Sequence, residues 1–71
     1  MPYVNIKITD EGVTREQKKA LIAGVTALLQ ETLGKNPKTT TVVIDEIHVD
    51  NWGMAGLPVP EYRDMYVKNS S

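Results

Sequence analysis

The segment from Arg15 to Leu33 constrains the fold of this chain most, because its apolar residues recur at the spacing of an α-helix. Thr14, followed by Gln17 three residues later, fits the capping box that begins many helices. Gly34 supplies a residue that tolerates the left-handed conformation typical of a helix end. The apolar positions are Leu21, Ile22, Val25, Leu28, Leu29 and Leu33. The sequence therefore predicts one helix over residues 15–33.

The segments on both sides of this helix have the pattern of β-strands. In the first, Val4, Ile6 and Ile8 alternate with more polar residues, which predicts a strand with one apolar face. The second, residues 40–48, is rich in β-branched side chains and contains the apolar run 42–44, which is typical of a strand covered on both faces. The order strand, helix, strand predicts an α/β fold with a single βαβ unit, whose parallel strands are joined by a right-handed crossover helix.

The region after the second strand has the composition of a turn or hairpin. Gly53 and Gly56 mark tight turns, and residues 57–60, which contain two prolines, are expected to be extended. The length of the chain allows one domain, residues 1–71, and we expect residues 67–71 to be frayed.

The composition excludes several classes of protein. Eight Lys and Arg residues stand against nine Asp and Glu residues, a net charge of −1, which gives no electrostatic case for binding nucleic acid or an anionic membrane. No apolar run approaches the roughly 20 residues of a membrane span, and no signal peptide is visible. The chain has no cysteine, and His48 is its only histidine. We therefore expect no metal site, no membrane contact and a cytoplasmic location.

The length of the chain predicts an oligomer. A domain of about 60 residues buries only about 60% of the surface of its unfolded chain, so its own core is marginal. Small domains without disulfides or metals often gain stability by association, and this chain is 41% apolar. We therefore expect a homo-oligomer whose subunits share an apolar face.

Pro2 stands where the first strand begins, and it has two interpretations. The structural one is that proline, which has no backbone N–H, is tolerated at the first residue of a strand. The chemical one requires the removal of Met1, since Pro2 then becomes the N-terminus. Its ring nitrogen is then a secondary amine that can accept protons or attack carbonyl groups. The residues around it leave both interpretations open.

Four stretches together resemble the 4-oxalocrotonate tautomerase family. They are MPYVNIKI, TREQKKALIAGVTALLQETLG, TTVVIDEI and NWGMAG, which cover most of residues 2–56. The resemblance implies a short βαβ chain that forms hexamers, or related trimeric assemblies, and completes its sheet with strands of several subunits. It also implies a cofactor-independent tautomerase that moves a proton between a carbon and the enol oxygen of a small keto or dienol acid. The processed Pro2 would be its general base.

The chain departs from this family at two positions that bind substrate carboxylates. Such tautomerases commonly carry an arginine in the loop before the helix and another near the start of the second strand. These positions fall here at Val13 and Thr41. Arg15 lies close to the first position, and the only other arginine is Arg63. A substrate with one carboxylate, or a neutral carbonyl compound, therefore fits better than a dicarboxylate held by two bidentate contacts.

Three residues besides Pro2 are candidates for the site, and each has an alternative role. Trp52 is either an aromatic wall against the substrate or a plug in a subunit interface, where tryptophan is common. Thr41 either donates its hydroxyl to a substrate oxygen or only begins the second strand. Arg15 either binds a carboxylate or is a surface charge on the helix. An apolar wall from Val42 and Trp52 would lower the pKa of the proline amine.

Two further functions remain open. The first is another activity of the same superfamily, a decarboxylase or a hydratase-dehalogenase, either of which can use a protonated proline. The second is a non-catalytic oligomeric binding module that has kept the fold, which the missing arginines favour. The pKa of the proline amine distinguishes the tautomerase from the other two enzyme activities. A general base works best with a pKa near the operating pH, whereas the other activities can use a proline that is protonated.

Overall fold

A computed structural model of the chain describes residues 1–67. Residues 68–71, part of the segment expected to be frayed, lie outside this range. The contacts of the chain divide it into two units, and each is described separately. These are Met1–Lys7 with Gly12–Asp45, and Ile8–Glu11 with Glu46–Ser71. Within residues 1–67 no helix is both long enough and apolar enough to cross a membrane.

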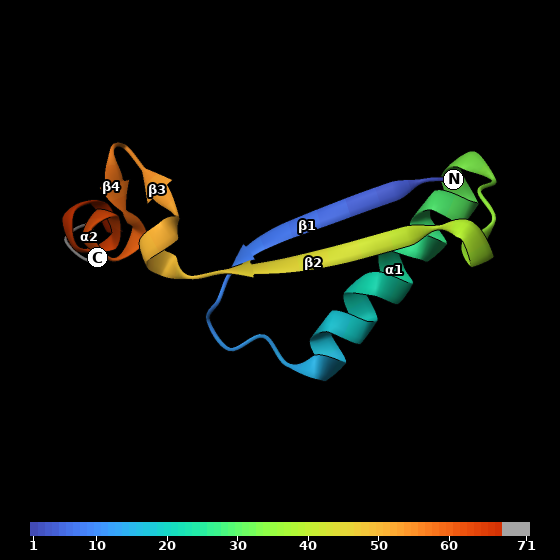
Figure 1. Cartoon of the computed structure of the whole chain (residues 1–71), viewed down its shortest axis with the longest axis horizontal. Helices are drawn as coiled ribbons and strands as arrows, with labels where there is room; N and C mark the ends of the chain where they lie inside the picture. The colour runs from blue at the N-terminus through green and yellow to red at the C-terminus, as the bar shows by residue number, and fades with distance from the viewer. Residues whose placement is uncertain (68–71) are drawn as a thin grey trace. The chain divides into compact units, whose positions relative to one another are not determined.

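Strands β1 (Tyr3–Thr9) and β2 (Thr41–Ile47) pair in a two-stranded sheet. Helix α1 (Arg15–Leu33) lies across one face of the two strands (Figure 1). The predicted βαβ unit is therefore confirmed. The helix has the predicted boundaries, and each end of β2 lies within one residue of its predicted position.

The two strands run parallel, as the sequence predicts. At one end of the sheet the backbone N–H of Thr41 donates to the carbonyl of Pro2 at 3.0 Å. At the other end the N–H of Asp10 donates to the carbonyl of Ile47 at 2.8 Å. Residue numbers rise together along both strands, which is the pairing that a crossover helix produces.

Both ends of α1 are fixed by the residues that the sequence indicates. The hydroxyl of Thr14 accepts a hydrogen bond from the N–H of Gln17 at 3.1 Å, and the side-chain carbonyl of Gln17 accepts one from the N–H of Thr14 at 2.9 Å. Gly34 has a φ of 68°, and its N–H donates to the carbonyl of Gln30 at 2.9 Å. These contacts satisfy backbone groups that a helix end otherwise leaves without partners.

The apolar residues of the first unit are only partly covered. Val25 on α1 is half-buried, whereas Leu28 and Leu33 are 60% and 61% exposed. The sequence predicts that both faces of β2 are covered. Val43 on β2 is 36% exposed, so one chain by itself does not provide this cover. Among residues 1–67 the fully buried apolar core consists of Val59 alone.

The second unit contains the predicted C-terminal hairpin. A 3-10 turn, η2 (Val49–Asn51), leads into β3 (Gly53–Met54), which pairs antiparallel with β4 (Leu57–Pro58). Between these strands Ala55 and Gly56 have φ values of 54° and 77°. Two consecutive positive φ angles are characteristic of a two-residue type I′ turn, whose twist matches that of the strands it joins.

One expectation for this region is wrong. Leu57–Pro58 is extended as predicted, but Val59 begins helix α2 (Val59–Tyr62), which continues as a π-helix, η3 (Arg63–Val67). Proline is compatible with the first turn of a helix, because the N–H that it lacks would have no intrahelical partner there. Pro60 therefore does not keep the segment extended.

Candidate active site

Pro2 lies directly before β1 and is half-buried, while Met1 before it is 94% exposed. The carbonyl of Pro2 accepts the hydrogen bond from the N–H of Thr41. Because proline has no N–H to contribute, the sheet loses no hydrogen bond at this strand start. The backbone thus holds Pro2 through its carbonyl and leaves its ring nitrogen outside the hydrogen bonding of the sheet.

Thr41 is the predicted site residue that the first unit places beside Pro2. A 3-10 turn, η1 (Pro37–Thr39), delivers the chain from α1 to Thr41. The side chain of Asn36 stabilises this turn by accepting a hydrogen bond from the N–H of Lys38 at 2.9 Å. The side chain of Thr41 is exposed, so its hydroxyl is accessible to a small molecule at the edge of the sheet.

Arg15 is the first residue of α1 and is exposed. From Pro2 the seven residues of β1 carry the chain away over roughly 23 Å, at about 3.3 Å per residue. Helix α1 then returns toward the start of β1 (Figure 1). The start of α1, where Arg15 lies, is therefore well separated from Pro2 within one chain (Figure 1).

Arg15 belongs to a basic groove on α1, with a volume of about 440 Å³. Lys18 and Lys19 line it together with the apolar Ile22 and Ala23. These residues are three, four, seven and eight positions beyond Arg15, so all five lie on one face of the helix. The groove combines positive charge with an apolar floor, which is suited to an anion that also has an apolar part.

Trp52 belongs to the second unit and is half-buried between η2 and β3. Its N–H donates to the carbonyl of Val49 at 3.3 Å, and its own carbonyl accepts from the N–H of Val59 at 2.9 Å. The buried Val59 is the core residue of the chain. The indole ring is therefore attached to backbone that is fixed on both sides.

An ion pair that the sequence analysis did not identify joins Glu11 to Arg63 in the second unit. The terminal guanidinium nitrogens of Arg63 donate to both carboxylate oxygens of Glu11, one of them at 2.9 Å, and the hydroxyl of Thr9 also donates to Glu11. The hydrogen bonds from Arg63 and then from Thr9 lower the pKa of Glu11 to about 2. The charge of Arg63 is thus balanced within its own chain.

A second polar cluster lies on β1 and β2. Asn5 donates its side-chain N–H to the carboxylate of Asp45 at 2.9 Å, and the ammonium group of Lys7 lies 3.0 Å from the same oxygen. Hydrogen bonds from Asn5 and then from Lys7 lower the pKa of Asp45. The side chain of Lys7 is 59% exposed and forms this ion pair at the surface. Since Asn5 and Lys7 share one face of β1, the cluster links the strands in a fixed register.

His48 lies at the end of the sheet, with a side chain that is 65% exposed. Its Nδ1 accepts a hydrogen bond from the N–H of Asp50 at 3.1 Å and so caps η2. Within residues 1–67 no three or more His, Asp or Glu side chains are grouped to hold a metal ion.

Comparison with known proteins covers almost all of the described chain. The family model described as Tautomerase enzyme matches residues 2–62. A probable tautomerase K2 from Dickeya dadantii is 67% identical over 63 residues, which span 89% of this chain and 94% of the relative. The 2-hydroxymuconate tautomerase of Bacillus subtilis is 41% identical over 56 residues, 79% of this chain and 89% of that protein.

A solved structure agrees with the sequence matches. The crystal structure of DmpI from Helicobacter pylori superposes with a TM-score of 0.83 at 42% identity. The superposition covers 89% of this chain and 97% of DmpI. The similarity therefore includes the strands, the crossover helix and the C-terminal hairpin.

Proposed function

The chain belongs to the 4-oxalocrotonate tautomerase family, and we propose that it is a cofactor-independent tautomerase with Pro2 as general base after removal of Met1. Its relatives are named as tautomerases, which supports this class of activity. The observation that carries the proposal is the position of Pro2. It is the first residue of the family match, and its nitrogen takes no part in the hydrogen bonds at the head of β1.

The chemistry of the proposal depends on the bond between Met1 and Pro2. While this bond is intact, the nitrogen of Pro2 is an amide nitrogen whose lone pair is delocalised into the carbonyl group. Removal of Met1 gives a cyclic secondary amine, and an ordinary α-amino group has a pKa of about 7.7–8.0. Pro2 is half-buried, and burial lowers the pKa of an amine toward the operating pH. The neutral amine would accept a proton from one atom of the substrate and return it to another.

The proposed substrate is a small keto or dienol acid. One relative is named 2-hydroxymuconate tautomerase, so dienol acids are the first compounds to test. Val13 and Thr41 stand where we expected carboxylate-binding arginines, and Arg63 is paired with Glu11. Arg15 would then be the cation that binds a carboxylate, reaching Pro2 from a second copy. A substrate with a single carboxylate suits this arrangement better than a dicarboxylate.

We further propose that the active form is a homo-oligomer, with a hexamer as the first expectation and a trimer-type assembly as the second. The exposed apolar residues support it, since Tyr3, Leu28 and Leu33 are each at least 60% exposed. In this assembly Trp52 would form an aromatic wall near Pro2 of the same or a neighbouring subunit.

The absence of a cation at positions 13 and 41 also favours a second candidate, a non-catalytic binding module of the same fold. A pH titration of the Pro2 nitrogen by ¹⁵N NMR on processed protein, combined with turnover assays, separates the candidates. A pKa near neutrality with turnover of an enol acid supports the tautomerase. A proline that stays protonated well above neutrality supports a decarboxylase or hydratase-dehalogenase, and the absence of any turnover supports the binding module.

A further inference from the structure

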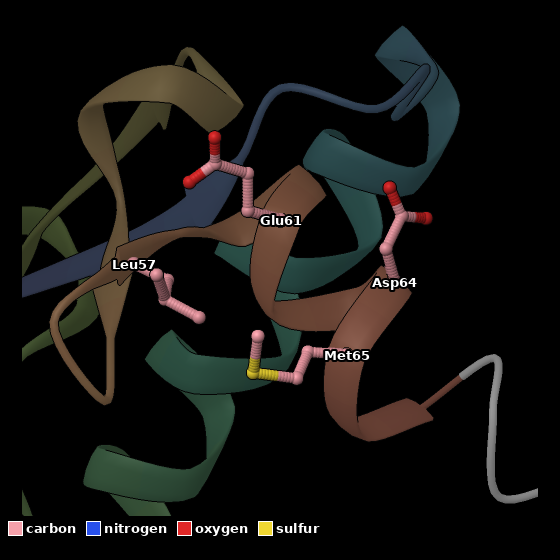
Figure 2. Close-up of a pocket in the computed structure, with 4 residues that line it drawn as sticks. All are labelled: Leu57, Glu61, Asp64 and Met65. Carbon is pink, nitrogen blue, oxygen red and sulfur yellow. The ribbon is translucent and has the colours of Figure 1, made fainter.

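The second unit carries an acidic groove with an apolar floor. It has a volume of about 380 Å³ and is lined by Leu57, Glu61, Asp64 and Met65. Figure 2 shows the side chains of Leu57 and Met65 pointing toward one another, while the carboxylates of Glu61 and Asp64 project away from them on one side. Met65 is 57% exposed, so the apolar part of the groove is largely open to water.

The basic groove on α1 is the counterpart of this surface in charge. It is lined by Arg15, Lys18 and Lys19 around Ile22 and Ala23, and its volume is about 440 Å³. Ile22 is 41% exposed. The chain as a whole has a net charge of only −1, so the two grooves are local concentrations of opposite charge on a nearly neutral protein.

We propose that the acidic groove of one subunit docks onto the basic groove of α1 in a second copy of the chain. Leu57 and Met65 would cover Ile22 and Ala23, which removes apolar surface of both subunits from water. The carboxylate of Glu61 would face the ammonium group of Lys19, and such complementarity selects the partner and its orientation. The inference rests on the homo-oligomer proposed above and names the surfaces that form one of its contacts.

This contact is heterologous, because each subunit uses two different surfaces. A heterologous contact generates a closed ring when its rotation closes and an open filament when it does not. A ring of three subunits would give the trimer, and pairing two such rings would give the hexamer. The contact also brings Arg15 of each subunit to a boundary between subunits.

Charge reversal at Lys19 and Glu61 tests the contact. Lys19→Glu and Glu61→Lys each place like charges opposite one another, and we expect each to raise the dissociation constant of the oligomer about tenfold. The double variant, which exchanges the two charges, should return it to within a few-fold of the unchanged protein. Lys35→Glu and Glu31→Lys, at exposed sites outside both grooves, are the matched controls. Sedimentation velocity over a dilution series measures the dissociation constants, and circular dichroism verifies the fold.

The outcomes distinguish this proposal from the one on which it depends. The docking contact is wrong if both single variants have the dissociation constants of their controls, or if the double variant associates no more tightly than the single variants. The proposal of a homo-oligomer is unaffected by either result. If the protein without substitutions is monomeric at every concentration, both the docking contact and the homo-oligomer are contradicted. If a charge-reversed variant fails to fold, the salt dependence of the unchanged protein decides. A docking contact of opposite charges weakens from 0.05 to 0.5 M salt, and salt-independent association contradicts it.

Discussion

The two arginines of the chain show at the residue scale how neighbours decide what a side chain can do. Arg63 donates both terminal guanidinium nitrogens to Glu11, so a substrate carboxylate would have to compete with Glu11 for the same donors. Arg15 instead lines an exposed groove with two lysines. Arg15 is therefore the arginine better placed to meet an anion, although it is well separated from Pro2 of its own chain (Figure 1).

The catalytic proposal makes a direct prediction for Pro2. Mass spectrometry of the purified protein should show the loss of one methionine, because a small second residue such as proline permits trimming. Pro2→Ala keeps an amine at the processed terminus but removes the ring that fixes the direction of its lone pair. We expect the tautomerase rate to fall by the roughly 10²–10⁴-fold that a positioned general base contributes. The mass of the oligomer and its melting temperature should change little.

Two results would contradict this role of Pro2. The first is full activity in the Pro2→Ala variant after its processing has been verified by mass spectrometry. The second is activity found only in the form that retains Met1, since its Pro2 nitrogen is an amide without basic character. Either result leaves Pro2 as a residue that only begins β1.

Substrate preference is the second prediction at this scale. With Val13 and Thr41 at the positions expected to bind carboxylates, we expect weak turnover of 2-hydroxymuconate, a dicarboxylate. Turnover of a mono-acid enol such as phenylenolpyruvate should be comparable or better. Steady-state kinetics with both compounds measure the ratio of kcat/KM. Efficient turnover of the dicarboxylate that is abolished in Arg15→Ala but kept in Lys35→Ala would show that Arg15 alone supplies the missing anchor.

The ion pair between Glu11 and Arg63 predicts a dependence of stability on pH. Glu11 has a pKa of about 2 in the folded chain against its ordinary value of 4.5, so folding favours its charged form. Its contribution is fully present above about pH 4.5 and is lost as the pH falls toward 2. Glu11→Gln should therefore lower the urea midpoint at pH 7 more than at pH 2.5. Glu31→Gln, which removes an exposed carboxylate on α1, is the control. If Glu11→Gln lowers the urea midpoint by the same amount at both pH values, the role of the pair is contradicted.

At the scale of elements, a helix end is predictable from the sequence where residues close in the chain form the hydrogen bonds of its terminal backbone groups. The boundaries of α1 were predictable because Thr14, Gln17 and Gly34 cap it with contacts three or four residues apart. The helix from Val59 onward was missed because Pro60 was assigned to extended structure, whereas the first turn of a helix also accepts proline. The pair of Glu11 and Arg63 left no sequence signal, since 52 residues separate its members.

The hairpin between β3 and β4 makes a prediction about its turn. Ala55 has a φ of 54°, a left-handed conformation that costs an L-residue with a Cβ roughly 1–2 kcal/mol. Asparagine tolerates this conformation, and Asn-Gly is favoured in type I′ turns. We expect Ala55→Asn to raise the free energy of unfolding by about 0.5–1 kcal/mol. Equilibrium urea denaturation at one protein concentration measures it.

The neighbouring Gly56 provides the opposite change as a control. Its φ is 77°, and a Cβ built there meets no atom within 4 Å. Gly56→Ala therefore introduces backbone strain without a clash, and the variant should lose about 1 kcal/mol of stability. If both substitutions shift the unfolding midpoint in the same direction, the turn is not the source of the effect.

At the scale of the whole molecule, a single chain buries little of its apolar surface. Val59 is the fully buried apolar residue of the described chain, while Leu21, Ile22, Leu28 and Leu33 on α1 are 40–61% exposed. The sequence predicted the strands, the helix and the hairpin because their signals are local. It placed Pro2 and Thr41 on their elements, but the cation that serves the site lies in another copy under our proposal. The size and apolar content of the chain predict that copies associate, but periodicity within one chain does not identify which of their side chains meet.

The last prediction concerns this assembly. Static light scattering of the processed protein at micromolar concentration should give a mass several times the 7.9 kDa of one chain, with six copies as the first expectation. Leu28 is 60% exposed on α1. If the assembly covers this side chain, Leu28→Lys should shift the mass toward the monomer, because a buried lysine without a partner is costly. Gln30→Lys, an exposed polar position on the same helix, should leave the mass unchanged. The turnover that depends on Pro2 should fall with dissociation, because under our proposal the Arg15 that binds the substrate belongs to a second copy. A clean monomer that retains full turnover would contradict both the oligomer and a site that needs a second copy.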